Sequence, residues 1–304
     1  MKVLIFGNHT IARECTEILR KRNDVEIIGF VGCDTDLDKT LGYPSLKKYC
    51  NQKNIPYIHA DDLNFSIDSL TKNQEIDFCF SFYYRKVFDT KTLSMAKNGF
   101  INIHPSLLPK YRGPIPSMWA ILNGEKITGT TMHYIDKGID TGNIIAQKEI
   151  SISPTISGFA LQTIIMKEGI RLFRQNINTI LTKKIEGTKQ DNSEASYYGP
   201  FKETLRLINW YQPSSNIINK ILAFTHPYAG AIAKIDKNIL FIWSAKKIVN
   251  LTYQLKGPGK IIEVKKDRTL IVTTVDGLLA INSYEFENKN DKDFSMLSKK
   301  FLLT

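Results

Sequence analysis

In the first half of the chain, short apolar runs alternate with stretches of helical periodicity. The runs are expected to be buried strands, because a parallel sheet covered on both faces produces nearly continuous apolar segments. Strands that alternate with helices indicate right-handed crossovers and a mostly parallel sheet. The predicted strands are residues 3–6, 26–31, 76–82 and 100–104, and the predicted helices include 11–19 and 46–50, with Ser45 as the N-cap of the latter.

The pattern changes in the second half. Two strand patterns, 128–135 and 144–152, flank the turn 136–142, and a long amphipathic helix is predicted over 159–181. Residues 187–200 (GTKQDNSEASYYGP) have no periodicity and indicate a linker. A helical stripe follows at 217–222, and then five short strands at 231–235, 240–243, 260–264, 269–274 and 278–284.

Together these patterns predict two domains. The first, residues 1–186, is a Rossmann-like, mostly parallel α/β sheet. Residues 187–204 form the predicted linker, and residues 205–304 form the second domain. Short strands at this spacing are typical of a small β-barrel, which we expect to be OB-like.

Composition places the chain among ordinary globular proteins, since 42% of its 304 residues are hydrophobic and 23% are charged. The N-terminal apolar run is too short for a signal peptide, and no run approaches 18 apolar residues. A cytoplasmic protein without a membrane segment is therefore expected. The four cysteines show no C-x-x-C spacing, which favours a reducing compartment and no metal site.

The formal net charge of +11 leaves two interpretations open. In the first, the charge reflects a compositional bias, because only nine of the 41 basic residues are arginines, the lysines are scattered, and the chain is also rich in isoleucine and asparagine. The alternative is an anionic ligand such as a nucleotide, a phosphate or RNA. The sequence lacks G-x-G-x-x-G, Walker A, G-x-S-x-G and H-E-x-x-H motifs, which excludes several common enzyme classes for an α/β fold.

Two polar side chains leave the predicted strand 100–104 together. Asn102 and His104 are two residues apart, so both point to the same face at the carboxyl end of the strand. An amide donor beside an imidazole suits stabilisation of an oxyanion and transfer of a proton. The alternative is a polar pair that satisfies a loop. His9 follows the first strand, where open α/β sheets bind ligands, and His133 fits either a structural hydrogen bond or chemistry.

Three segments in this order resemble the 10-formyltetrahydrofolate-dependent formyltransferases. They are NIH (102–104), SLLPKYRG (106–113) and GTTMHYIDKGIDTG (129–142). The resemblance continues through LINWYQPSS (207–215), HPYAGAIAKI (226–235) and LFIWSAK (240–246), which look like the C-terminal barrel of the tRNA and sugar branches. FSFYYRKVF (80–88) and KYRG look closest to the formyltransferase domain of the enzyme that modifies 4-amino-arabinose for lipid A in lipopolysaccharide biosynthesis.

The resemblance implies roles for individual residues. His104 is expected to act as the acid, Asn102 as the oxyanion donor and Asp140 as the partner that keeps His104 protonated. The co-substrate 10-formyltetrahydrofolate is expected along two loops, and no metal is required. Its expected contacts are Lys86, Val87, Phe88, Asp136, Lys137, Gly138, Ile139 and Asp140. Pro114 stands where the lipid A enzyme has an arginine, so a folate contact there must use its carbonyl or ring.

The resemblance also points to an acceptor. Methionyl-tRNA formyltransferases carry a basic insertion after the second strand, whereas residues 32–41 here (GCDTDLDKTL) hold three Asp against one Lys. A nucleotide-linked amino sugar, with a 4-amino-4-deoxy or related dideoxy sugar, is therefore the predicted substrate, contacted by Asn8, His9 and Tyr84. Nucleic acid is not the expected partner. Sugar-branch members are often homodimers, so a homodimer stays open. The alternatives are a methionyl-tRNA formyltransferase, formylation of a small metabolite amine, and a non-catalytic folate or RNA binder.

Overall fold

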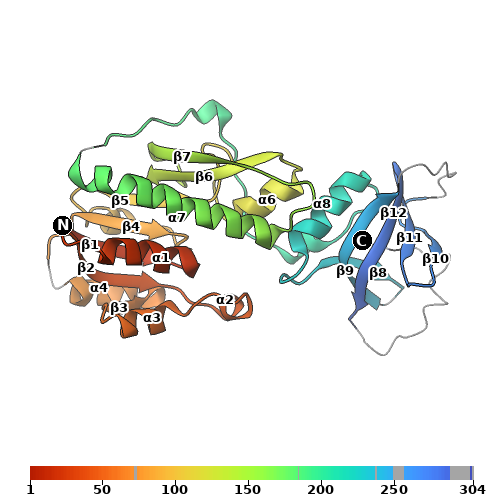
Figure 1. Cartoon of the computed structure of the whole chain (residues 1–304), viewed down its shortest axis with the longest axis horizontal. Coiled ribbons are helices and arrows are strands. Elements are labelled where there is room, and N and C mark those ends of the chain that lie inside the picture. The colour runs from red at the N-terminus through yellow and green to blue at the C-terminus, as the bar shows by residue number, and fades with distance from the viewer. Residues whose placement is uncertain (72–73, 184, 237, 249–256, 288–301, 303–304) are drawn as a thin grey trace. The chain divides into compact units, whose positions relative to one another are not determined.

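The structure is a computed structural model, and it describes residues 1–71, 74–183, 185–236, 238–248, 257–287 and 302. The chain divides into two compact units that interleave in sequence (Figure 1). The first comprises residues 1–116, 127–151 and 163–199, and the second comprises residues 117–126, 152–162 and the described part of 200–304. Residues 187–199, within the predicted linker, group with the first unit. The domain boundaries at 186 and 204 stay predictions.

A seven-stranded sheet forms the centre of the first unit, in the order β3-β2-β1-β4-β5-β6-β7. Neighbouring strands from β3 to β5 are parallel, whereas β6 is antiparallel to β5, and β7 to β6. The predicted mostly parallel α/β sheet is confirmed. The strands are β1 (Lys2–Gly7), β2 (Glu26–Gly32), β3 (Tyr57–His59), β4 (Phe78–Phe82), β5 (Phe100–His104), β6 (Ile127–Tyr134) and β7 (Ile144–Ser151).

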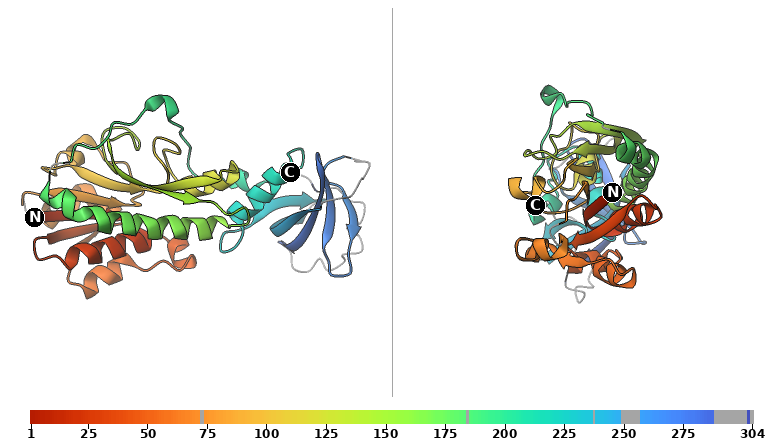
Figure 2. Two further views of the ribbon diagram at one scale, coloured as in Figure 1. Left: turned by 45° about the horizontal axis from the view of Figure 1, so that its top comes forward. Right: turned by 90° about the vertical axis from the view of Figure 1, so that its left-hand side faces the viewer.

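Helices cover both faces of this sheet, which explains why its strands β1 and β4 are mostly apolar. Val3 and Ile5 pack into the core beneath α1, α3 and α7, while Leu4 and Phe6 pack on the opposite face beneath α4. Figure 2 shows α1 and α7 side by side on their face of the sheet. The helices of this unit are α1 (His9–Arg20), α2 (Asp36–Thr40), α3 (Leu46–Gln52), α4 (Leu63–Thr71), α5 (Thr90–Leu93) and most of α7 (Gly158–Thr182), whereas α6 (Pro116–Leu122) groups almost entirely with the second unit.

The elements with strong periodicity are confirmed within a few residues, and Ser45 caps α3 by accepting a hydrogen bond from Lys48 N. Among the elements of the first unit, β3, α2 and α4 were not predicted. β3 has three residues and lies at the edge of the sheet, so it is too short for an alternating pattern to develop. Across the described residues, we find no helix with the length and apolar character needed to cross a bilayer.

The second unit contains a five-stranded antiparallel sheet in the order β10-β11-β12-β9-β8. Trp210 and the apolar stripe of α8 (Ser214–Phe224) pack in its core. All five strands were predicted, but β9 extends beyond residue 243 because its polar end pairs with β12. Closure of this sheet into an OB-like barrel stays a prediction. The strands are β8 (Ala231–Ile235), β9 (Asn238–Ile248), β10 (Ile261–Val264), β11 (Leu270–Thr274) and β12 (Gly277–Phe286).

Candidate active site

Strand β5 places Asn102 and His104 at the carboxyl edge of the parallel strands. Ser81 of β4 pairs with Asn102 on one side, and β6 pairs on the other, with His133 opposite Asn102 and Thr131 opposite His104. His104 is 4% exposed. Alternation along the sequence was therefore enough to place this pair on one strand end. That β6 lies beside the pair is known only from the order of strands in the sheet.

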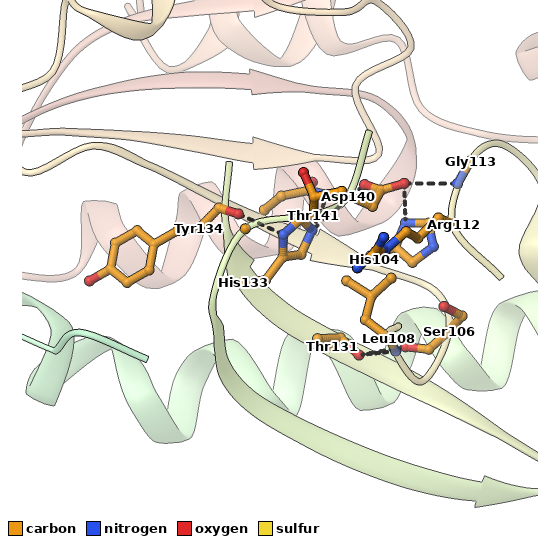
Figure 3. Close-up of polar contacts among 12 residues, drawn as sticks. His104, Ser106, Leu108, Arg112, Gly113, Thr131, His133, Tyr134, Asp140 and Thr141 are labelled. Atoms are coloured by element: carbon orange, nitrogen blue, oxygen red, sulfur yellow. Dashed lines mark hydrogen bonds and ion pairs between the residues drawn. The ribbon is translucent and has the colours of Figure 1, made fainter. Parts of the chain in front are cut away.

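Both ring nitrogens of His104 face hydrogen-bond acceptors (Figure 3). Nε2 lies 2.8 Å from the carbonyl oxygen of Tyr111, which can only accept, so Nε2 carries a proton. Nδ1 lies 3.5 Å from Oδ2 of Asp140. The ring is thus held between a backbone carbonyl on one side and a carboxylate on the other.

Asp140 reaches His104 from the loop between β6 and β7. Its backbone has φ of 54°, in the left-handed region, and its Oδ2 accepts a hydrogen bond of 2.9 Å from Gly113 N. Gly113 has φ of 99°, and an added Cβ would lie 2.3 Å from the carbonyl oxygen of Tyr198. The turn at residues 110–113 can therefore hold this N–H against the carboxylate only with glycine at position 113.

His133 is the residue that the sequence left ambiguous. Its Nδ1 lies 2.7 Å from the carbonyl oxygen of Tyr134, so Nδ1 carries the proton and Nε2 accepts from the Asn102 amide at 3.1 Å. Burial lowers the pKa of His133 to about 4, despite the opposing charge of Asp140. A neutral His133 thus fixes the orientation of the Asn102 amide. Only the pairing of β5 with β6 reveals this role.

Replacement of His133 by glutamine is expected to change how stability depends on pH. The unfolded state binds a proton on this imidazole below about pH 6.5, and the native state does so only near pH 4. The wild type should therefore lose about 3 kcal/mol of unfolding free energy relative to His133→Gln as pH falls across that interval. Urea unfolding of both proteins at neutral and acid pH measures this difference. Parallel losses in the two proteins would contradict a buried neutral His133.

The two predicted folate loops, residues 86–88 and 136–140, both adjoin the apolar cluster on the α4 face of the sheet. Tyr84, Phe88 and Ile135 pack against this cluster beneath the loops. Above it, Val87 is 81% exposed and Ile139 is 54% exposed, so each loop presents an apolar side chain to solvent. Large exposed apolar side chains beside buried polar groups are typical of ligand sites.

The other expected folate residues have varied surroundings. Lys86 forms an ion pair with Asp61, and Pro114 is exposed directly after Gly113. Asp136 shapes the second loop, because its Oδ1 accepts from Gly138 N at 3.0 Å and from the Thr141 hydroxyl. Lys137 and Gly138 are exposed.

The residues predicted to contact the substrate that receives the formyl group lie at the ends of β1 and β4, on the same edge of the sheet as His104. Asn8 Oδ1 accepts from Cys33 N at 3.2 Å, while its Nδ2 is buried without a partner. The hydroxyl of Tyr84 is also buried without a partner. Buried polar groups are normally hydrogen-bonded, so these unsatisfied atoms mark a place that a ligand or ordered water completes.

His9 belongs to a charged cluster that the sequence did not reveal. Its Nε2 lies 3.0 Å from Oδ1 of Asp38, and Arg85 also binds this carboxylate, at 2.6 Å. Burial alone would raise the pKa of Asp38, but hydrogen bonds from His9, Arg85 and Thr35 outweigh it and hold the pKa well below its usual range. The carboxylate is therefore ionised and neutralised by its neighbours.

The carboxylates of the acidic loop 32–41 are mostly engaged in contacts of their own. Asp38 is paired as described, and Asp34 accepts hydrogen bonds of 3.0 Å from Ser45 Oγ and from Leu46 N. Two of the three carboxylates are thus engaged inside the unit. A tRNA acceptor is therefore disfavoured by the low number of basic residues in this loop, one lysine, and not by its acidity.

The structure brings Asn102, His104, Asp140 and His133 together. It places Asn8, His9 and Tyr84 along the same edge, because β1, β4 and β5 are neighbours. Arg112 and Gln190, which were not predicted as site residues, are buried behind Asp140 and contact each other. Arg112 stands in the quoted KYRG segment, but Gln190 lies in the predicted linker and carried no signal.

Two family models match the chain. The model described as formyl transferase matches residues 1–177, and the model described as formyl transferase, C-terminal domain, matches residues 201–301. A methionyl-tRNA formyltransferase from Alkaliphilus oremlandii (strain OhILAs) is 31% identical over 296 residues, which cover 95% of this chain and 93% of that protein.

Two further proteins are similar over the whole length of this chain or most of it. The bifunctional polymyxin resistance protein ArnA from Wigglesworthia glossinidia brevipalpis is 30% identical over 325 residues, covering 100% of this chain and 49% of that protein. The chain thus spans about half the length of that relative. The crystal structure of an N-formyltransferase from Helicobacter canadensis in complex with folinic acid and dTDP-3-aminofucose has a TM-score of 0.72 and 26% identity, covering 92% of this chain and 98% of that one.

Proposed function

Because this chain belongs to the formyl transferase family, we propose that it is an N-formyltransferase whose acceptor is the primary amine of a nucleotide-linked amino sugar. The formyl donor is 10-formyltetrahydrofolate. The observation that carries the proposal is the assembly of an amide, an imidazole and a carboxylate, from Asn102, His104 and Asp140, at one edge of the sheet. The Helicobacter canadensis structure supports both substrates, since it holds folinic acid and dTDP-3-aminofucose.

The geometry supports a direct transfer between the two substrates. The amine attacks the formyl carbon and gives a tetrahedral species with negative charge on oxygen. We assign Asn102 as the donor to this oxyanion, because His133 holds its amide in one orientation. As the bond from the formyl carbon to N10 breaks, His104 supplies a proton to N10, and the surplus proton of the amine restores it. Asp140 stabilises the charged imidazole before it gives up the proton and again once the proton is restored.

The folate is proposed to lie along residues 86–88 and 136–140. The exposed side chains of Val87 and Ile139 would cover its apolar ring, and backbone groups of the second loop would hold its polar edge. Lys86 offers a cation at the rim, paired with Asp61. At Pro114 only a carbonyl or a ring contact is available.

The nucleotide end of the acceptor is proposed to lie at the ends of β1 and β4. The unsatisfied buried groups of Asn8 and Tyr84 and the imidazole of His9 would contact it there. The relative that binds dTDP-3-aminofucose supports a nucleotide-linked acceptor. The assay described below identifies the base of the nucleotide and the amine that is formylated. A cytoplasmic location and a homodimeric assembly stay predictions.

One alternative acceptor has a specific observation in its favour. The methionyl-tRNA formyltransferase from Alkaliphilus oremlandii matches almost the full length of both chains. Against it stands the short loop 32–41, whose sequence has one lysine and no basic insertion. Binding to tRNA is dominated by phosphate contacts and would fall steeply with salt.

Assays of tetrahydrofolate release test this proposal. The purified chain is incubated with 10-formyltetrahydrofolate and, separately, with UDP-, dTDP- and GDP-linked amino sugars or initiator Met-tRNA. We expect release with one sugar nucleotide and a formylated sugar by mass spectrometry, with no release by His104→Ala. Turnover with Met-tRNA alone would overturn the sugar assignment. Folate binding without turnover of any of these acceptors would also overturn it and point to a small amine.

A further inference from the structure

Residues 188–198, which we call the strap, contact two segments: the one that carries Asp140 and the turn whose Gly113 N–H binds its carboxylate. At one end, Thr188 pairs with Ile144 through two backbone hydrogen bonds of 2.8 Å. At the other, Arg112 N donates to Ser196 O at 2.8 Å, and Tyr198 N donates to Arg112 O at 3.0 Å. The strap therefore connects the loop that carries Asp140 with the turn that supplies Gly113.

Arg112 lies between the strap and the loop and is 1% exposed. Its guanidinium donates to neutral acceptors, namely Gln190 Oε1 at 2.6 Å and 3.2 Å, Asn192 Oδ1 at 2.9 Å, and the Tyr197 hydroxyl. All three partners belong to the strap. Because a buried cation is costly unless its N–H groups are satisfied, the side chain ties the strap to the turn.

Gln190 connects this guanidinium to the catalytic loop. Its Oε1 accepts from Arg112, and its Nε2 donates to the backbone oxygens of Asp140 at 2.8 Å and Gly142 at 2.7 Å. The side chain is 6% exposed. The acceptor side of this amide faces a cation and the donor side faces two carbonyls, so only one orientation satisfies the site.

The loop needs such support at Asp140. A left-handed backbone is unfavourable for a residue other than glycine and persists where the surroundings over-determine it. Gln190 holds the carbonyl of Asp140 itself, while Gly113 N holds its carboxylate. The two contacts fix the residue from the backbone and from the side chain.

We propose that Gln190 is a positioning residue for Asp140, and that the strap exists to hold the carboxylate at its place beside His104. The inference rests on the proposed formyl transfer, because it is Asp140 acting on His104 that gives the position its importance. Gln190 touches neither the reacting groups nor the expected folate contacts other than the backbone of Asp140. Its loss should therefore lower kcat and leave the affinity for folate unchanged.

Gln190→Glu separates positioning from stability. The glutamate still accepts from Arg112, and the new ion pair maintains the buried guanidinium. It has no N–H to offer, so the carbonyls of Asp140 and Gly142 face a carboxylate instead. Since displacement of a catalytic group by about 1 Å can cost about 100-fold, we expect kcat to fall by about 30- to 100-fold. Binding of folinic acid, measured by calorimetry, and the thermal midpoint should stay close to wild type.

Asn192→Ala is the matched control, because Asn192 binds the same guanidinium but does not contact the catalytic loop. It should retain kcat. Hydrogen exchange of the full chain supplies a readout independent of turnover, and exchange in peptides spanning 136–143 should accelerate in Gln190→Glu and not in Asn192→Ala. If the glutamate variant does not fold, Gln190→Asn replaces it, since a shorter amide cannot reach both sides.

The outcomes separate the inference from the proposed function. If the wild type formylates none of the acceptors, the proposed function fails, and hydrogen exchange still decides whether Gln190 holds the loop. If the wild type is active, a folded Gln190→Glu with unchanged kcat overturns the inference. Equal losses of kcat and thermal stability in both variants would also overturn it, because they would indicate a structural role alone.

Discussion

Asp140→Asn is expected to reduce kcat for formyl transfer by about 1,000-fold, the order of a general acid–base contribution, in a chain that stays folded. The asparagine oxygen can still accept from Gly113 N, so the loop keeps the contact that the carboxylate makes now. What disappears is the negative charge 3.5 Å from Nδ1 of His104. Without that charge, the imidazolium that supplies the proton is less favoured. Initial rates at saturating substrates measure the loss.

Thermal unfolding and a distant variant serve as controls for Asp140→Asn. Asp24→Asn makes the same change at an exposed carboxylate that pairs with Arg22, and it should leave kcat unchanged. Asp140→Ala should be at least as inactive, because it removes the contact with Gly113 as well. An Asp140→Ala variant with wild-type stability and intact activity would sink the assignment of this residue.

Asn102→Ala is expected to reduce kcat by about 100-fold or more, equivalent to about 3 kcal/mol of transition-state stabilisation. The amide is held by His133 at 3.1 Å, so its remaining N–H is oriented before the substrates bind. An oxyanion exists only after the amine has attacked, and an interaction made only then lowers kcat rather than raising KM. Steady-state kinetics with both substrates varied would separate the two constants.

A purely structural role for Asn102 gives a different result. If the amide merely satisfied His133, Asn102→Ala would lower stability and leave kcat near the wild-type value. Asn98→Ala provides the matched control, because Asn98 is an exposed residue just before the same strand, at its opposite end. Loss of kcat in Asn102→Ala alone, with folinic acid binding retained, supports the oxyanion role.

The strands and helices of the first unit could be predicted wherever their burial produces a recognisable pattern of apolar residues in the sequence. β1 is covered on both faces, so the continuous apolar run of residues 3–6 marked it. The 25-residue α7 was found because its apolar face repeats over many turns. β3 has three residues and no such pattern, since its place depends on pairing with β2.

The candidate site residues also fall into those marked by a local pattern and those placed only by the fold. Asn102 and His104 share one strand, and alternation alone places them on one face. Asp140 was matched through a family motif, because a loop of Asp and Gly residues carries no specific signal by itself. His133 stayed ambiguous because its partner, Asn102, lies 31 residues away in the chain and on a neighbouring strand.

By itself, the sequence determined the order of the elements, the class of the sheet and the strand that presents the amide and the imidazole. These properties follow from local patterns, since burial acts on residues one to four positions apart. Only the tertiary structure decided that His133 orients Asn102, that Arg85 and His9 contact Asp38, and that Gln190 holds the backbone of Asp140. Each of these contacts joins residues far apart in the chain, and a single sequence carries no pattern for a hydrogen bond that forms only after the strands have assembled.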